Sequence, residues 1–274
     1  MAIPALKHID SGEHQISYRE RGPEIPDAPA LFFVHGMGGG SGNWETQYEK
    51  FSDRYRVIGW DAPGYGGSSP FETDLPSVGD YIMAMADFLD ALGIEKAHLV
   101  GHSYGGIMVT AFNRAYPGRV LSLTLAQAVI GGGREKDVKK REAGITARIE
   151  ELEKLGVEGF AALHAPRSCS PDAAPDVVAR GIDVTASLNK AGYLRQFRSL
   201  RHANIFEWTA RPRVPAMIVS GEHDKTAGRK MVRDIADAMP GIRRHEIAGI
   251  GHMIYLEHPD RFNALLEDLL AEVT

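Results

Sequence analysis

The sequence predicts an α/β fold, in which helices cover both faces of a mostly parallel β-sheet. Apolar runs of four to seven residues alternate with amphipathic helical patterns from about residue 30 to residue 126, and the alternation resumes near residue 214. These runs lack the polar positions of half-exposed strands, so both faces of the sheet are expected to be covered. Strand and helix in alternation favour right-handed crossovers between parallel strands.

Length and composition are those of a globular protein with a substantial core. The chain has 274 residues, of which 43% are hydrophobic, and a formal net charge of -5. This slightly acidic balance argues against nucleic acid as a partner. Cys169 is the only cysteine, which excludes an internal disulfide and a thiolate metal site and favours a reducing compartment.

The amino-terminal residues and the hydropathy favour a cytoplasmic protein. Residues 1–6 lack the basic region, apolar run and cleavage site of a signal peptide. The sequence contains no apolar stretch long enough to span a bilayer, so we expect no membrane partner. Monomer and homodimer both stay open.

Strands and helices are expected to alternate through the first half of the chain. Residues 15–18 alternate as a half-buried edge strand, and Asn43 is a candidate cap for a short helix that carries Trp44. Helical spacing of apolar side chains predicts a helix over residues 78–92 and another from residue 104 to about residue 116. Buried parallel strands are expected at residues 30–34, 57–60, 97–100 and 121–125.

A polar and mainly helical segment interrupts this alternation. It begins at the three glycines 131–133, and an apolar stripe at helical spacing follows over residues 138–155. A further helix is expected at residues 191–200. Three prolines are expected to break the helical pattern between these two helices, at positions 166, 171 and 175.

The sheet pattern returns directly after the polar segment, which we therefore interpret as an insertion. The returning elements are a strand at 214–220, a helix at 229–239, a strand at 243–247 and a helix at 262–270. We predict a core domain of residues 1–128 and 209–274 and a helical cap of residues 129–208.

The segment Gly101-His102-Ser103-Tyr104-Gly105-Gly106 joins an apolar strand to a helix. A Gly-x-Ser-x-Gly motif in that context exposes the serine hydroxyl at a sharp turn. Gly101 and Gly105 have no β-carbon, so strand and helix can approach each other closely. The free amides of the helix start point to where an oxyanion would form. The motif therefore predicts a nucleophilic serine.

Four loops that follow strands are expected to meet at the carboxyl edge of the sheet. They span residues 35–40, 101–106, 220–224 and 248–252. A serine nucleophile needs a base within hydrogen-bond reach, and the base needs a group that fixes its tautomer. Ser103, Asp224 and His252 supply these three groups in one chain order. Glu222 is also close to the acid position and is expected to hold its loop instead.

These motifs together resemble the α/β-hydrolase superfamily, from about residue 15 to the end of the chain, without the insertion. The shared features are His35-Gly36, the loop 61–69, Gly-His-Ser-Tyr-Gly-Gly, Gly-Glu-His-Asp and Gly-His-Met-Ile-Tyr-Leu-Glu-His-Pro. The resemblance implies that Ser103 is the nucleophile, that His252 is the general base and then the acid, and that Asp224 orients His252. Position 103 is serine, which sets aside relatives with an aspartate nucleophile.

The resemblance also implies an oxyanion hole and a set of pocket residues. The backbone N–H groups of Met37 and Tyr104 would bind the oxyanion. The substrate-binding residues are expected to be Gly36, Met37, Trp44, Tyr104 and Met253.

Several other polar side chains are expected to have structural roles. His35 is expected to brace its loop, and His102 to point away from the nucleophile. The charged run 134–141 is expected to face solvent, and Cys169 to be inert. The three arginines of the second insertion helix are also expected in solvent, with binding of a substrate carboxylate as the alternative; they are Arg195, Arg198 and Arg201.

The predicted activity is hydrolysis of an ester, lactone or enol-lactone of a small carboxylic substrate through an acyl-Ser103 intermediate. The expected partners are this substrate and water, with no metal and no organic cofactor. The chain resembles 3-oxoadipate enol-lactonases and carboxylesterases in its short loops and single cap. Two alternatives stay open. One is carbon–carbon bond hydrolysis of the meta-cleavage product type, and the other is a ligand-binding protein of the same fold without turnover.

Overall fold

The computed structural model describes residues 3–25 and 27–273, so Met1 and Ala2 of the amino-terminal segment lie outside it. The strands are β1 (Leu6–Ser11), β2 (His14–Arg21), β3 (Ala30–Val34), β4 (Arg56–Trp60), β5 (Ala97–His102), β6 (Val120–Ala126), β7 (Ala216–Gly221) and β8 (Arg243–Ile247). They form one sheet in the order β1-β2-β4-β3-β5-β6-β7-β8. Both pairs made by β2 are antiparallel, and the other five are parallel, which confirms the predicted fold class.

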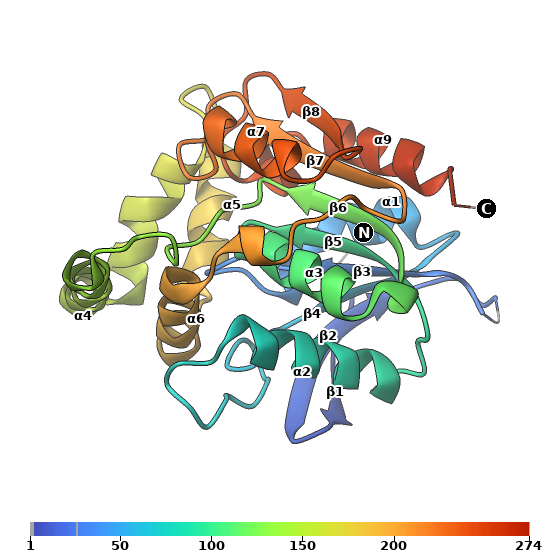
Figure 1. Ribbon diagram of the computed structural model, residues 1–274, viewed down its shortest axis with the longest axis horizontal. Coiled ribbons are helices and arrows are strands. Elements are labelled where there is room, and N and C mark those ends of the chain that lie inside the picture. The colour runs from blue at the N-terminus through green and yellow to red at the C-terminus, as the bar shows by residue number, and fades with distance from the viewer. Residues whose placement is uncertain (1–2, 26, 274) are drawn as a thin grey trace.

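Helices cover both faces of this sheet (Figure 1). Those of the core are α1 (Glu45–Phe51), α2 (Val78–Ala91), α3 (Tyr104–Ala115), α7 (Arg229–Asp237), α8 (Ile254–Glu257) and α9 (Pro259–Leu270). Side chains of α2, α3 and α7 form one apolar cluster with the sheet, and those of α1 and α9 form a second. On β3, Phe32 joins the first cluster, while Leu31 and Phe33 join the second, because successive side chains of a strand point to opposite faces.

Three further helices stand together at one end of the sheet, on the left of Figure 1. They are α4 (Val138–Ser168), α5 (Pro175–Ala186) and α6 (Lys190–His202), and they lie between β6 and β7 in the chain. The predicted helical cap falls on these elements, and its exact boundaries stay a prediction.

Helix α6 is fastened to the core by close polar and backbone contacts. The hydroxyl of Tyr65 lies 2.7 Å from Oε1 of Gln196, and the hydroxyl of Tyr104 lies 2.6 Å from Oγ of Ser199. A β-carbon at position 192 would lie 2.0 Å from the carbonyl oxygen of residue 64, so glycine is required for this approach.

The structure corrects the prediction of an edge strand at residues 15–18. That segment belongs to β2, which lies between β1 and β4, and the edge is β1. Strand β1 has the sequence LKHIDS and is mostly exposed. It carries no apolar alternation because neither of its faces is well buried.

One local prediction in the helices is wrong, and another is confirmed. Asn43 does not cap α1; it lies in the preceding 3₁₀ turn, Ser41–Trp44, and its Oδ1 accepts from the Gly40 amide at 3.2 Å. The prolines separate the helices as predicted, because α4 ends two residues after Pro166 and Pro175 is the first residue of α5. Within α4, the helix changes direction at Gly156, whose φ of 65° and ψ of 177° are not helical.

Within the described residues, the helices are all too short or too polar to cross a membrane.

Candidate active site

Ser103 lies at the sharp turn between β5 and α3. Its φ of 54° and ψ of -116° are strained for a residue with a side chain, at a cost of about 1–3 kcal/mol. A β-carbon at Gly101 would lie 2.3 Å from the carbonyl oxygen of Gly105, and one at Gly105 would lie 2.3 Å from that of Val34. Only glycine at these two positions allows the helix to start directly against the sheet.

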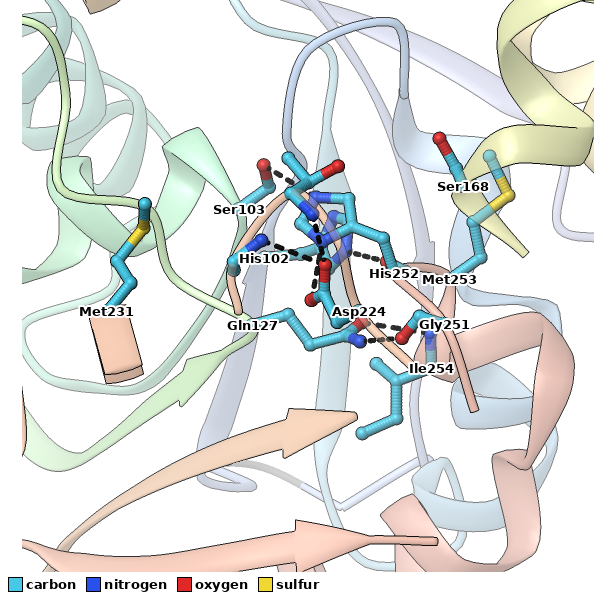
Figure 2. A network of polar contacts seen from close by, with 12 residues as sticks. His102, Ser103, Gln127, Ser168, Asp224, Met231, Gly251, His252, Met253 and Ile254 are labelled. Atoms are coloured by element: carbon cyan, nitrogen blue, oxygen red, sulfur yellow. Dashed lines mark hydrogen bonds and ion pairs between the residues drawn. The ribbon is translucent and has the colours of Figure 1, made fainter. Parts of the chain in front are cut away.

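Ser103, His252 and Asp224 come together at the carboxyl edge of the sheet, from three separate loops (Figure 2). Oγ of Ser103 lies 3.0 Å from Nε2 of His252, and Nδ1 of His252 lies 2.8 Å from Oδ2 of Asp224. A proton on Nδ1 is donated to the carboxylate, which leaves Nε2 free to accept the serine proton. The contacts therefore form the chain that an activated serine requires.

The carboxylate of Asp224 is held in its charged form. Burial alone would raise the pKa of this group, but the charge and hydrogen bond of His252 lower it below its usual value. The amides of Thr226 and Ala227 each donate to Oδ1 at 2.8 Å and lower the pKa further. Asp224 is thus an ionised partner that fixes the His252 tautomer.

Two side chains from neighbouring strand ends hold the loop that carries His252. Oε1 of Gln127 accepts from the amide of Ile254 at 3.0 Å, and its Nε2 donates to the carbonyl of Gly251. Nε2 of His102 lies 2.8 Å from the carbonyl oxygen of His252 (Figure 2). Gln127 is fully buried and has a φ of 51°, a second strained residue beside Ser103. Gln127 was not among the predicted site residues, because a glutamine after a strand belongs to no catalytic motif of the sequence.

His102 has the structural role that its position predicts. Its imidazole makes a hydrogen bond with the His252 carbonyl and none with Ser103. Burial, followed by the neighbouring charge of His252, lowers the pKa of His102 to about 3. The ring is therefore neutral and acts as a hydrogen-bond donor.

The cap holds the same loop from the other side. The amide of His252 donates to the carbonyl of Ser168, the last residue of α4, at 2.6 Å. The Glu257 carboxylate accepts from the amides of Gly251, Met253 and Ser170, at distances of 2.7–3.1 Å. The two contacts made by Ser168 and Ser170 link residues more than eighty positions apart, so no local sequence pattern indicates them.

The loop after β3 lies directly against Ser103. A β-carbon at Gly36 would lie 2.7 Å from Cβ of Ser103. Nδ1 of His35 lies 2.7 Å from the Gly36 carbonyl oxygen, and Nε2 of His35 accepts from the amide of Ala62 at 3.0 Å. The prediction that His35 braces this loop is confirmed.

Two backbone amides beside Ser103 are candidates for the oxyanion hole. Tyr104 is the first residue of α3, so its amide has no acceptor within the helix. In the described part of the chain, no backbone oxygen accepts from the amide of Met37, one residue after Gly36. Their role in binding an oxyanion stays a prediction.

A cavity of about 240 Å³ opens between the triad and the cap. Ser103 and His252 form one end of it, and Met37 and Met253 line it as predicted for pocket residues. The cap contributes the aromatic side chains of Phe160, Tyr193 and Phe197 to the wall of the cavity. It also contributes three polar side chains, those of Arg148, His164 and Thr185. A larger hollow of about 910 Å³ lies around Arg56 at the opposite edge of the sheet and does not reach the triad.

Three predicted pocket residues do not line this cavity in the described structure. Trp44 is fully buried in the core, with its ring 4.8 Å from Phe33 and 5.3 Å from Tyr255. The side chain of Tyr104 points to α6, where its hydroxyl meets Ser199. Gly36 packs against Cβ of Ser103 behind the cavity surface. All three therefore lie near the cavity without forming part of its wall.

The arginine that reaches the cavity is Arg148. None of the three arginines of α6 lines it, and Arg195 is paired with Asp74 at 3.0 Å on the outside. Arg148 lies three residues after Ile145 and four before Leu152, both of which are buried. This helical spacing places Arg148 on the buried face of α4, a signal that the sequence analysis did not use.

Glu222 and Cys169 behave as expected. Oε2 of Glu222 accepts from the amide of Gly249 at 3.0 Å, which confirms that this carboxylate holds its loop. Cys169 is buried, and burial raises the pKa of its thiol to about 11, so the thiol is unreactive at neutral pH. Among the described residues, no cluster of His, Cys, Asp or Glu side chains is arranged to hold a metal ion.

Comparison with known proteins agrees with this architecture. A family model described as "alpha/beta hydrolase fold" matches residues 29–259. The chain is 30% identical over 255 residues to 3-oxoadipate enol-lactonase 1 of Acinetobacter baylyi, a match that covers 90% of each sequence.

Two solved structures have the same overall architecture. The enol-lactonase from Burkholderia xenovorans aligns with a TM-score of 0.84 and 23% identity, over 97% of this chain and 100% of that one. A thermophilic esterase from Thermogutta terrifontis aligns with a TM-score of 0.85 and 20% identity, over 98% of this chain and 99% of that one. At these identities the likeness shows the fold alone.

Proposed function

The chain belongs to the α/β-hydrolase family, and from this premise we propose that it is a serine hydrolase of small esters or lactones, enol-lactones included. The observation that carries the proposal is the unbroken chain of contacts from Ser103 through His252 to Asp224. These contacts face a cavity that is mostly apolar and small. The relative named as an enol-lactonase supports the same reaction class.

The first half of the reaction transfers the acyl group to the enzyme. Oγ of Ser103 attacks the substrate carbonyl carbon while Nε2 of His252 takes the hydroxyl proton. The negative charge moves to the carbonyl oxygen, where the amides of Met37 and Tyr104 donate to it. One such donor contributes about 2.7–4 kcal/mol of transition-state stabilisation. The bond to the leaving oxygen then breaks, and His252 gives its proton to that oxygen.

The second half returns the enzyme to its starting state. Water donates a proton to His252 and attacks the acyl carbon of the ester on Ser103. The tetrahedral intermediate collapses, the proton passes from His252 to Oγ, and a carboxylic acid leaves. Asp224 stays ionised throughout and stabilises the imidazolium that forms twice in the cycle.

Hydrolysis of a substrate panel tests this proposal. The panel contains p-nitrophenyl esters, lactones and dienoate ketones, assayed with the wild type and with Ser103→Ala. We expect turnover of esters or lactones by the wild type and none above background by the variant. Turnover of the dienoate ketones alone would replace the ester reaction by carbon–carbon bond hydrolysis. Turnover that survives in Ser103→Ala would show that another residue is the nucleophile.

A further inference from the structure

The cavity beside Ser103 has one permanent charge in its wall. The described residues that line it include no aspartate, glutamate or lysine, and Arg148 is their single arginine. Burial lowers the pKa of His164, and the charge of Arg148 lowers it further, so that ring is neutral at pH 7. A ligand in this cavity therefore meets a cation from the cap helix α4 and the nucleophile from the core.

The guanidinium of Arg148 is held in place by its neighbours. It lies over the rings of Phe160 and Phe197, at 5.3 and 5.4 Å from their centroids. Nη1 lies 3.2 Å from a carboxylate oxygen of Glu151 and 3.2 Å from Nε2 of His164. A planar cation between two aromatic faces loses little further freedom when it binds a ligand.

The same contacts leave part of the guanidinium unused. Both polar contacts of Arg148 involve Nη1, and Nε and Nη2 have no protein partner among the described residues. Glu151 lies one turn along α4 and does not line the cavity, so its carboxylate does not compete there for space. Free parallel N–H groups on a fixed plane match the two oxygens of a carboxylate.

Cavity size limits the ligand that can span both ends. Its volume of about 240 Å³ lies just below the range of about 300–1,000 Å³ that is usual for pockets of small ligands. A small molecule bound here can contact both Ser103 and Arg148, because both residues line the cavity.

We propose that Arg148 is a subsite for a carboxylate, and that the substrate is a small ester or lactone that carries a carboxylate remote from the bond that is cleaved. This inference rests on the proposed function, because it names the substrate class of the same site. The apolar walls between the two ends hold the carbon chain that joins the carboxylate to the reacting carbonyl.

Matched pairs of esters test the subsite. Mono-p-nitrophenyl succinate, glutarate and adipate are each compared with the p-nitrophenyl ester of butanoate, pentanoate or hexanoate. The measured quantity is the ratio of kcat/KM for the acidic ester to that for its neutral counterpart. We expect Arg148→Gln to lower this ratio by about ten- to a hundredfold for the best chain length, the loss typical of a charge-assisted hydrogen bond. Arg148→Lys keeps the charge without the planar fork and should retain part of the ratio.

Arg195→Gln is the matched control, because Arg195 forms its ion pair with Asp74 outside the cavity. Its ratio should equal that of the wild type. An equal ratio in the wild type and in Arg148→Gln would overturn the subsite. A circular-dichroism spectrum of Arg148→Gln equal to that of the wild type shows that the fold is intact.

Binding without turnover separates this inference from the proposed function. Ser103→Ala is titrated with succinate, glutarate and adipate by calorimetry, with and without the Arg148→Gln change. Loss of dicarboxylate binding in the double variant supports the subsite even if every ester resists hydrolysis. Equal binding by both proteins, or by neither, contradicts it even if the ester reaction is established.

Discussion

The carboxyl edge of the sheet and the cap form two sides of one cavity, but they hold their side chains by different means. At the edge, Ser103 is fixed by strained backbone, and Asp224 and His252 by hydrogen bonds with main-chain groups. In the cap, Arg148 is held by other side chains, two aromatic rings and Glu151. The proposed chemistry thus relies on a strained backbone and on hydrogen bonds with main-chain groups, whereas the proposed carboxylate subsite relies on side-chain contacts that single substitutions can change.

Two helices of the cap, α6 and α4, also differ in how they are held and in what they contribute. Helix α6 is docked on the core through Gly64 and Gly192 and through buried hydrogen bonds. Helix α4 turns at Gly156 and contributes wall residues from both of its halves, Arg148 before the turn and Phe160 after it. We infer that α6 sets the position of the cap and that α4 sets the shape of the cavity.

Of the substitutions at the carboxyl edge, Asp224→Asn should lower kcat the most. The amide can no longer hold the Nδ1–H tautomer or stabilise the imidazolium, so kcat should fall by about 10⁴-fold, as in serine proteases. Acidic and neutral esters should lose the same factor, because the edge acts on both alike. Steady-state kinetics on one matched ester pair measure it, and a loss below tenfold would show that Asp224 is not the orienting acid.

Acid should destabilise the core through its buried histidines. Burial lowers the pKa of His98 to about 4, so between pH 6.5 and pH 4 the unfolded chain binds a proton that the folded chain does not. Stability therefore falls as the pH falls through this window, by up to roughly 3 kcal/mol for this residue. Urea unfolding of the wild type and His98→Gln across this range should give a shallower dependence for the variant. If the variant shows the same dependence of stability on pH as the wild type, the lowered pKa of His98 is contradicted.

Gly192→Ala should break the docking of the cap. The new β-carbon meets the Gly64 carbonyl, and overpacking of this kind costs about 1–3 kcal/mol. Gly118→Ala is the control, because nothing lies within 4 Å of a β-carbon there. Thermal unfolding should show a lower Tm for the first variant only. Equal Tm values would mean that the cap is not fastened at this contact.

Gln127→Leu should have the smallest effect, confined to the alignment of His252. The two hydrogen bonds to Gly251 and Ile254 are lost, and kcat should fall by about tenfold with KM unchanged. Gln47→Leu removes a buried amide contact to Asn263, between α1 and α9, and should lower stability without changing kcat. If both variants lose activity only in proportion to stability, Gln127 is merely structural.

Much of the edge could be predicted because its constraints are local. Glycine is required on both sides of Ser103, because a β-carbon at either position would collide with backbone atoms. The residue types themselves therefore mark the turn. Each loop also follows an apolar strand, which places it at the edge. The hydrogen bonds of Gln127 could not be predicted, because its partners Gly251 and Ile254 follow it by 124 and 127 positions in the chain.

The cap was less predictable because its contacts depend on where its helices turn. The kink of α4 at Gly156 brings both halves of the helix to the cavity, and no predicted feature of the sequence marked a change of direction there. Trp44 was predicted in the pocket and lies in the core. A large aromatic residue next to a catalytic loop can fill the core instead of the pocket, and only packing against Phe33 and Tyr255 decides between the two.

Labelling with a fluorophosphonate probe, followed by mass-spectrometric mapping, tests the central claim most directly. The contacts among Ser103, His252 and Asp224 predict one adduct, on Ser103, and its absence in folded Ser103→Ala. An unlabelled but folded wild type would contradict the account and favour a ligand-binding protein, and an adduct on any other residue would show that the nucleophile is misassigned.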